Sequence, residues 1–223
     1  MVKLSIILPT YNESENIKKI IPQIKEEFPK SEIIVVDDNS PDDTAKIAKR
    51  LGVKVILRKV KEGLGAALMD GYNNAAGDTI VSMDADCSIS VKDIHKLLDK
   101  LRENDLVVGS KYSKESKAEG FSTKKQKILS ILGNKFFVVF FRLPVDDVTL
   151  NFRAFSRETW KRLFLREKTN VFFLEMLVDA KRKNMKIAQI PIHFAKRRYG
   201  VSKTNLSKLM PLYFKYLMKT LFD

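Results

Sequence analysis

The stretch TIVSMDADCSIS, residues 79–90, decides how the chain is interpreted. Its first five residues are apolar or β-branched with one small polar residue, which is typical of a buried β-strand. Two aspartates follow, Asp84 and Asp86, separated by one residue. Carboxylates this close repel each other and are costly to desolvate. An earlier stretch, IIVVDDNSPDDT at 33–44, repeats the pattern with Asp37 and Asp38, so acidic residues follow two strands.

Strands and helices alternate around these two stretches. We expect strands at residues 3–8, 32–37, 53–58, 79–84 and 105–110, and helices at residues 16–28, 42–51, 63–77 and 91–104. Such alternation is typical of an open, mostly parallel α/β sheet, in which ligands bind beyond the carboxyl ends of the strands. Both pairs of aspartates lie at such ends.

The alternation weakens beyond residue 110. Residues 110–127 are polar and basic, which predicts a mobile loop. Further on, we expect helices at 127–143, 172–184 and 206–222, a strand at 151–156 and an extended segment at 186–197. No repeat or low-complexity linker divides the chain, so we predict a single domain over residues 1–223.

Charge is distributed unevenly along the chain, whose formal net charge is +14. Residues 1–108 hold 16 basic and 18 acidic residues, whereas residues 109–223 hold 25 and 9. This asymmetry indicates a polyanionic partner: nucleic acid, anionic lipid or a phosphorylated substrate. The single cysteine excludes an intramolecular disulfide. No signal peptide is expected, and no apolar run approaches the ~20 residues that span a bilayer, so we predict no transmembrane span of its own.

The pair Asp84 and Asp86 has the chemistry of a cation site. Residues i and i+2 of an extended segment point the same way, so both carboxylates can face one ligand. Hard divalent cations take oxygen ligands, and Mg²⁺ usually combines one or two carboxylates with substrate phosphates. The alternative is a pair of aspartates that only cap a turn.

Eight motifs occur in an order that supports the first interpretation. They are LPTYNE (8–13), VVDDNSPDDT (35–44), KEGLGAALMDG (61–71), MDADCS (83–88), VGSKY (108–112), DVTLNFRAF (147–155), FLEML (173–177) and IPIHFAKRRYGVSK (190–203). Together they resemble the family 2 glycosyltransferases, most closely the dolichyl-phosphate mannose synthases. The resemblance implies an α/β fold of the GT-A type, a Rossmann-like open mixed sheet flanked by helices. It also implies a nucleotide-sugar-binding half at 1–110 and an acceptor and membrane-interface half at 111–223.

The resemblance also implies a role for individual residues. The nucleotide-sugar site would comprise Pro9, Tyr11, Glu13, Val36, Asp38, Asp84, Ala85, Asp86 and Lys111. Mg²⁺ or Mn²⁺ would be held by Asp86 and Ser88, and the acceptor phosphate by Arg153, Arg197, Ser202 and Lys203. Of these residues, Asp86, Lys111 and Arg197 would act in catalysis.

Three positions depart from the family pattern. Lys111 stands where the family usually has arginine, which removes a bidentate donor. Ser88 stands where a further metal ligand is often found, and Asn151 replaces the usual glycine before Phe-Arg. Gly63 and Gly65 do not form a dinucleotide fingerprint, because the pattern is incomplete and does not follow the first strand.

The implied reaction is an inverting, metal-dependent transfer of mannose from GDP-mannose to dolichyl (polyprenyl) phosphate. We expect it at the cytoplasmic face of the membrane, with the protein peripheral, no nucleic acid bound, and a small membrane-protein partner possible. Lysines along helix 206–222 leave a broad apolar face, suited either to the lipid headgroup region or to the protein core. The alternatives are transfer of glucose from UDP-glucose to polyprenyl phosphate, another family 2 sugar transfer, or a non-catalytic basic protein that binds anions or membranes.

Overall fold

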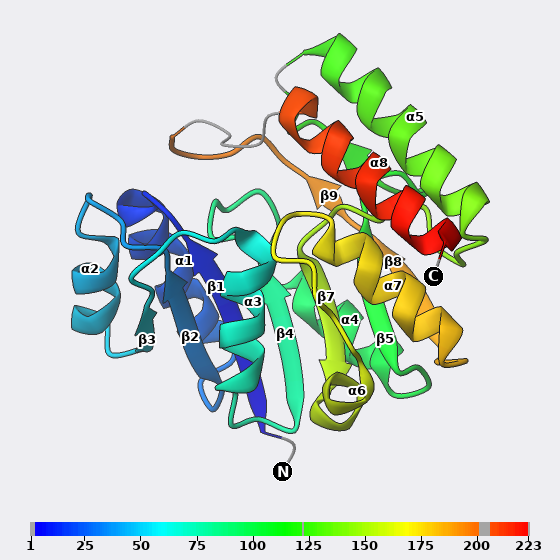
Figure 1. Cartoon of the computed structure of the whole chain (residues 1–223). Coiled ribbons are helices and arrows are strands. Elements are labelled where there is room, and N and C mark those ends of the chain that lie inside the picture. Colours follow the sequence, from blue (N-terminus) through cyan, green and yellow to red (C-terminus); the bar gives the residue numbers. More distant parts are fainter. Residues whose placement is uncertain (1–2, 122, 201–205, 223) are drawn as a thin grey trace.

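A seven-stranded mixed sheet with the strand order β3-β2-β1-β4-β7-β5-β8 forms the centre of the fold (Figure 1). The computed structural model describes residues 3–121, 123–200 and 206–222. The strands are β1 (Leu4–Thr10), β2 (Glu32–Asp37), β3 (Lys54–Leu57), β4 (Thr79–Met83), β5 (Leu106–Ser110), β7 (Phe152–Ser156) and β8 (Ile187–Pro191). All run parallel except β7, which lies antiparallel between β4 and β5.

Helices cover both faces of this sheet (Figure 1). They are α1 (Ser14–Glu27), α2 (Thr44–Arg50), α3 (Leu64–Asn73), α4 (Asp93–Leu101), α5 (Lys124–Phe140), α6 (Arg157–Arg162), α7 (Phe172–Arg182) and α8 (Leu206–Phe222). The apolar faces of α1 and α4 pack on one side of the sheet, and those of α3 and α7 on the other. All seven residues of β1 are buried, as expected for a central strand covered on both faces.

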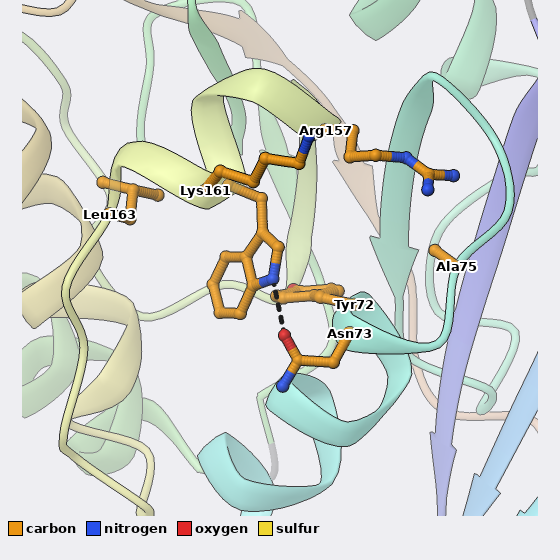
Figure 2. A pocket seen from close by; sticks show the side chains of 7 residues that line it. Tyr72, Asn73, Ala75, Arg157, Lys161 and Leu163 are labelled. Atoms are coloured by element: carbon orange, nitrogen blue, oxygen red, sulfur yellow. Dashed lines mark hydrogen bonds between the residues drawn. The ribbon is translucent and has the colours of Figure 1, made fainter.

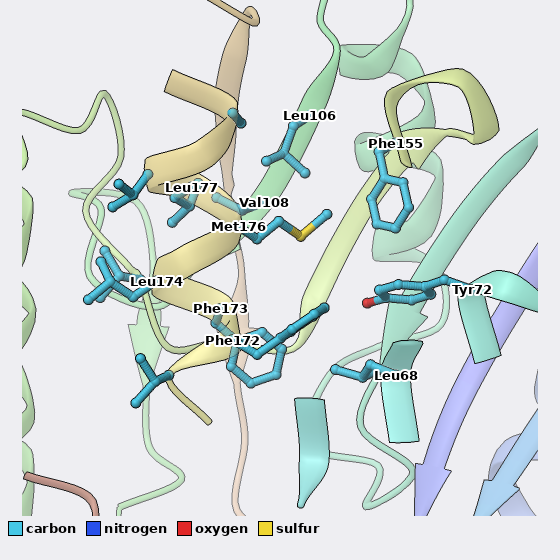
Figure 3. Packing of buried hydrophobic residues seen from close by; sticks show 14 of the residues in the cluster. Leu68, Tyr72, Leu106, Val108, Phe155, Phe172, Phe173, Leu174, Met176 and Leu177 are labelled. Carbon is cyan, nitrogen blue, oxygen red and sulfur yellow. The ribbon is translucent and has the colours of Figure 1, made fainter. Parts of the chain in front are cut away.

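The second face is built around aromatic side chains (Figure 3). Phe172 of α7 lies beside Tyr72 of α3, with 6.2 Å between ring centroids, and Tyr72 meets Phe155 of β7 edge-on at 5.0 Å. The hydroxyl of Tyr72 donates a hydrogen bond to Ser82 on β4. Close contact also explains Gly65, because a Cβ there would lie 2.6 Å from the carbonyl oxygen of Glu167. The two glycines that open α3 therefore serve helix packing, in agreement with rejecting a phosphate-binding fingerprint.

The antiparallel strand β7 agrees with the mixed sheet that the resemblance implied. Two features were not expected from the sequence. The helix α6 directly follows β7. The segment predicted to be a mobile loop contains β6 (Lys117–Ala118), which pairs with β9 (His193–Phe194) in a small parallel sheet. A two-residue strand is too short to show a periodic pattern in the sequence, and it is defined only by its pairing with a distant segment.

Helices α5 and α8 lie side by side at one end of the molecule (Figure 1). The rings of Phe137 and Tyr213 join them, with centroids 5.3 Å apart. Most of the apolar side chains of α5 remain exposed, and α8 also carries exposed apolar side chains. The most exposed of these apolar side chains are Ile128, Leu132, Phe136 and Val139 on α5, and Phe214, Leu221 and Phe222 on α8. Among the described residues, no helix combines the length and apolarity needed to cross a bilayer.

Candidate active site

Acidic side chains gather where β1, β2 and β4 end. Glu13 follows β1, Asp38 follows β2, and Asp84 and Asp86 follow β4. Strand β1 lies between β2 and β4, so the chain order reverses at this point. Open α/β sheets bind their ligands in the crevice beyond such a reversal. The fold therefore brings together the two acidic segments that the sequence singled out.

The turn after β4 orients its two carboxylates differently. Asp84 accepts a hydrogen bond from Asn151 Nδ2 at 3.0 Å, and Asp86 Oδ1 accepts one from the backbone N–H of Ser88 at 3.0 Å. Burial, and then the charge of Asp86, raise the pKa of Asp84 to about 7. The repulsion expected from the sequence is therefore present, and a cation at this turn would relieve it.

Residues 195–199 lie across the aspartate turn. The N–H groups of Ala195 and Arg198 donate to the carbonyl oxygens of Ser88 and Asp86, at 2.8 and 3.3 Å. This pairing places the guanidinium of Arg197 3.3 Å from Asp86 Oδ2 and 3.1 Å from Glu13 Oε1. Arg197 therefore links the ends of β1 and β4, and its role as a catalytic cation stays a prediction. Ser202 and Lys203, predicted for the acceptor phosphate, lie outside the described residues.

A second group of polar side chains lies at the ends of β1, β2 and β3. Tyr11 is partly exposed, and Lys61 Nζ lies 3.4 Å from its ring centroid. Asp38 is buried and paired with Arg58 Nη1, and Arg58 also binds Asp70. Burial raises the pKa of Asp38, although Arg58 opposes the rise. Arg58 was missed by sequence reasoning, and its signal is an arginine that directly follows the short strand β3.

Three predicted donor contacts have their side chains inside the protein. Val36 is fully buried against α3, and the side chain of Ala85 belongs to the core on the other face. Pro9 is buried in β1, opposite Val36. Their place at the donor site stays a prediction, and any contact with a donor would be made by their backbone, because both faces of the sheet are covered and the side chains are buried.

Lys111 has an internal partner rather than an open position. Its Nζ lies 2.8 Å from Asp147 Oδ2 and 3.1 Å from Thr149 Oγ1, and the lysine side chain is 7% exposed. Burial alone would raise the pKa of Asp147, but the charge of Lys111 and hydrogen bonds from Lys111 and Thr149 lower it. Lys111 thus forms a buried ion pair with Asp147, and its predicted contact with the donor diphosphate stays a prediction.

Arg153 is the clearest correction. It is fully buried, and its guanidinium donates to the carbonyl oxygens of Leu150, Phe173 and Val148. Burial lowers its pKa to about 10. The predicted role at the acceptor phosphate is wrong for this structure, because β7 runs through the sheet interior and turns this side chain towards α7. Glu175 is also structural, since it accepts hydrogen bonds from the N–H groups of Arg166 and Glu167.

The donor set at the aspartate turn suits a hard divalent cation. Ser88 Oγ is buried and has no hydrogen-bond partner in the described part of the chain, although this residue was predicted to hold a metal with Asp86. Within that part, no group of three or more acidic, histidine or cysteine side chains forms a closed metal cluster. A cation here would use one carboxylate and the hydroxyl, and would need further oxygen ligands from a substrate.

A separate cavity of about 350 Å³ lies between α3 and α6, at the end of the sheet where β4 begins and β7 ends (Figure 2). Its lining includes Tyr72, Asn73, Arg157 and Trp160. The indole N–H of Trp160 donates to Asn73 Oδ1, and the guanidinium of Arg157 donates to the carbonyl oxygen of Gly77. Among the described residues, no carboxylate lines this cavity, so the aspartate turn is the stronger candidate for chemistry.

Comparisons with known proteins show what the chain is similar to. Residues 5–164 match the model of the family described as "Glycosyl transferase family 2". An undecaprenyl-phosphate mannosyltransferase of Micrococcus luteus is 31% identical, over 91% of this chain and 87% of its own. A polyprenol monophosphomannose synthase of Mycolicibacterium smegmatis is also 31% identical, over 94% and 84%. A dolichol-phosphate mannosyltransferase of Pyrococcus furiosus is 33% identical over 91% of this chain, which spans 59% of that longer protein.

Solved structures of more distant proteins share the fold. Mannosyl-3-phosphoglycerate synthase from Rubrobacter xylanophilus superimposes with a TM-score of 0.75 at 19% identity, over 99% of this chain and 73% of its own. Glucosyl-3-phosphoglycerate synthase from Mycobacterium tuberculosis, solved with Mn²⁺ and UDP-glucose, gives 0.74 at 21%, over 99% and 78%. The predicted GT-A fold is confirmed.

Proposed function

Because the chain belongs to glycosyl transferase family 2, we propose that this glycosyltransferase moves mannose from a nucleotide donor to a polyprenyl phosphate. Three relatives that are 31–33% identical to this chain have names that describe mannose transfer to a polyprenyl or dolichyl phosphate. The observation that carries the proposal within this chain is the turn after β4. There two carboxylates, the guanidinium of Arg197 and the buried hydroxyl of Ser88 meet at the switch point of the sheet, and that hydroxyl has no hydrogen-bond partner among the described residues.

The donor would lie across the carboxyl ends of the strands, from β2 to β4. Tyr11 can stack on a base, and Asp38, held by Arg58, can accept hydrogen bonds from ribose hydroxyls. The diphosphate would then reach Asp86, Ser88 and Arg197. We propose Mg²⁺ or Mn²⁺ at Asp86 and Ser88, where it would neutralise the charge of the departing diphosphate. GDP-mannose is the donor that we favour.

The acceptor simplifies the chemistry required of the protein. A phosphate monoester is already anionic at neutral pH, so its oxygen can attack the anomeric carbon without a general base. The bond from that carbon to the donor diphosphate breaks as the new bond forms, which inverts the anomeric centre. Arg197 would stabilise negative charge on the leaving diphosphate, and Glu13 holds the guanidinium in place from the other side.

Helices α5 and α8 would bring the enzyme to the lipid. Their exposed apolar side chains stand beside exposed lysines, including Lys124, Lys135, Lys215 and Lys219. An amphipathic surface of this composition lies in the headgroup region of a bilayer and is drawn to anionic lipid. We therefore place the reaction at the membrane surface, on the cytoplasmic face, where a small membrane protein could assist docking.

Transfer of label into lipid tests the proposal. The protein is incubated with polyprenyl phosphate, Mg²⁺ or Mn²⁺, and labelled GDP-mannose or UDP-glucose in parallel, and the organic phase is then counted. Label from GDP-mannose in that phase is the expected result. Label from UDP-glucose alone would replace mannose by glucose. If neither donor leaves label in the organic phase but label is transferred to an oligosaccharide, the lipid-phosphate acceptor is overturned.

A further inference from the structure

Asn151 stands directly opposite the aspartate turn. Strand β7 enters the sheet at the rim where β4 leaves it, and Met83 pairs with Phe152 in the last register of the two strands. The next residues outward are Asp84 and Asn151, and the Nδ2 of the asparagine donates to Asp84 Oδ1 at 3.0 Å. The antiparallel direction of β7 therefore adds a side chain to the site that a parallel strand would not supply.

The other end of this amide lacks a partner. Asn151 is 2% exposed, and its Oδ1 is buried without a hydrogen-bond partner in the described part of the chain. A buried carbonyl oxygen without a hydrogen-bond partner destabilises the fold, so native proteins rarely retain one without a use. The assignment of nitrogen and oxygen follows from chemistry, because a carboxylate accepts hydrogen bonds and needs the N–H side of the amide.

The order of the strands indicates which part of a donor would reach this oxygen. At the carboxyl ends of the parallel strands, the side chains proposed to contact the nucleoside, Asp38 and Tyr11, follow β2 and β1. The aspartate turn follows β4, and Asn151 precedes β7, the next strand in the sheet. A nucleotide sugar laid along that order places its base first, its diphosphate at the turn and its sugar last. Diphosphate oxygens cannot donate to Asn151 Oδ1, whereas a sugar hydroxyl can.

We propose that Asn151 is a specificity-determining residue that accepts a hydrogen bond from a hydroxyl of the transferred sugar, while its amide nitrogen holds Asp84. This inference rests on the proposed function for the direction of the donor. A site that pairs a buried polar group with a substrate hydroxyl discriminates strongly against an analogue lacking it, because the protein group then stays unpaired.

Binding measured without acceptor tests the inference. Isothermal titration calorimetry in Mn²⁺ compares GDP-mannose, GDP and the singly deoxygenated GDP-mannose analogues, with UDP-glucose and UDP in parallel. We expect Asn151→Ala to weaken the nucleotide sugar by about 10- to 100-fold while GDP changes less than about twofold. One deoxygenated analogue should bind wild type and variant equally, which identifies the contacted hydroxyl.

Asn134 provides a matched control. It is also a buried asparagine, but its Oδ1 accepts from the N–H of Val148 and its Nδ2 donates to Ser130. Asn134→Ala should lower Tm without changing the ratio of sugar-nucleotide to nucleotide affinity. Equal weakening of GDP and GDP-mannose by Asn151→Ala would show that the residue only shapes the turn, and would overturn the inference, as would no change in either.

The same experiment separates this inference from the proposed function. If Asn151→Ala weakens the binding of GDP-mannose but the wild type transfers no mannose to polyprenyl phosphate, the inference stands and the proposed acceptor is overturned. If Asn151→Ala transfers the sugar to polyprenyl phosphate with unchanged sugar selectivity, the proposed function stands and the inference is overturned. Failure of wild type to bind either nucleotide sugar would overturn both.

Discussion

Arg197 and Asp86 share a contact at the centre of the site, with 3.3 Å between Nη2 and Oδ2. The two residues are 111 positions apart, and the backbone pairing of residues 195–199 with the aspartate turn brings them together. The carboxylate proposed to hold a metal is thus already engaged by a cation of the protein. The guanidinium can remain there when a diphosphate is bound, or turn towards the diphosphate and release the carboxylate.

Substitution of Asp86 is expected to remove transfer. Asp86→Asn keeps the size of the side chain but takes away the charge, and we expect activity to fall at least ~10²-fold, the usual effect of losing a group that stabilises the leaving charge. The measurement is labelled mannose in the organic phase. Asp99→Asn, at an exposed position on α4, is the control and should match wild type. Full activity in Asp86→Asn would remove the proposed metal role.

Substitution of Arg197 is expected to separate metal binding from catalysis. In Arg197→Gln the carboxylate of Asp86 no longer has a competing cation, so Mn²⁺ without nucleotide should bind more tightly, by roughly tenfold for ~1.4 kcal/mol. Transfer should nevertheless fall, because the leaving diphosphate loses its guanidinium. Calorimetry with Mn²⁺ alone and the transfer assay check the two effects. Weaker Mn²⁺ binding in the variant would show that Arg197 supports the cation site rather than competing for it.

The buried pair of Lys111 and Asp147 is expected to contribute to stability. Lys111→Met leaves a fully buried carboxylate without its cation, which typically costs ~3–5 kcal/mol. The free energy of unfolding from urea titration measures the loss. Lys111→Met combined with Asp147→Leu should recover most of it, because both charges are then absent. A single variant as stable as wild type would show that the pair makes no net contribution.

The same pair predicts a pH dependence with a definite sign. In wild type the pKa of Asp147 is lowered, so its contribution is present above the unfolded value near ~4 and is lost as pH falls. In Lys111→Met the hydrogen bonds from Thr149 still oppose burial but the charge of Lys111 no longer does, so the pKa of Asp147 rises and stability is lost as pH increases. The difference in unfolding free energy between the two proteins should therefore grow from about pH 4 upward. A difference independent of pH would contradict this assignment.

The surface formed by α5 and α8 is expected to bind lipid. Phe136→Glu places a charge on the exposed apolar face of α5, where the side chain is 51% exposed, so folding should change little. Flotation with vesicles containing anionic lipid should show reduced binding. Leu57→Glu, on the edge strand β3 at 53% exposure and far from α5 (Figure 1), is the matched control. Equal loss in both variants would indicate a general charge effect.

The sequence by itself determined the parts of this protein that depend on local pattern. Strand and helix alternation follows from apolar spacing, so the first five strands and first four helices were predicted in the correct order. The aspartates after β2 and β4 were found for the same reason, because a carboxylate pair at a strand end is visible without a structure. The role proposed for Arg197 came from the resemblance of its motif to the family, and it stays a prediction.

Only the tertiary structure decided which distant residues meet. The antiparallel insertion of β7 turned Arg153 into the core and brought Asn151 to Asp84, although both residues occupy one short motif. The pairing of Lys111 with Asp147 likewise depends on how separate segments close around the rim. Side-chain burial and partners are set by the direction and neighbours of a strand in the sheet, and a local stretch of sequence contains neither.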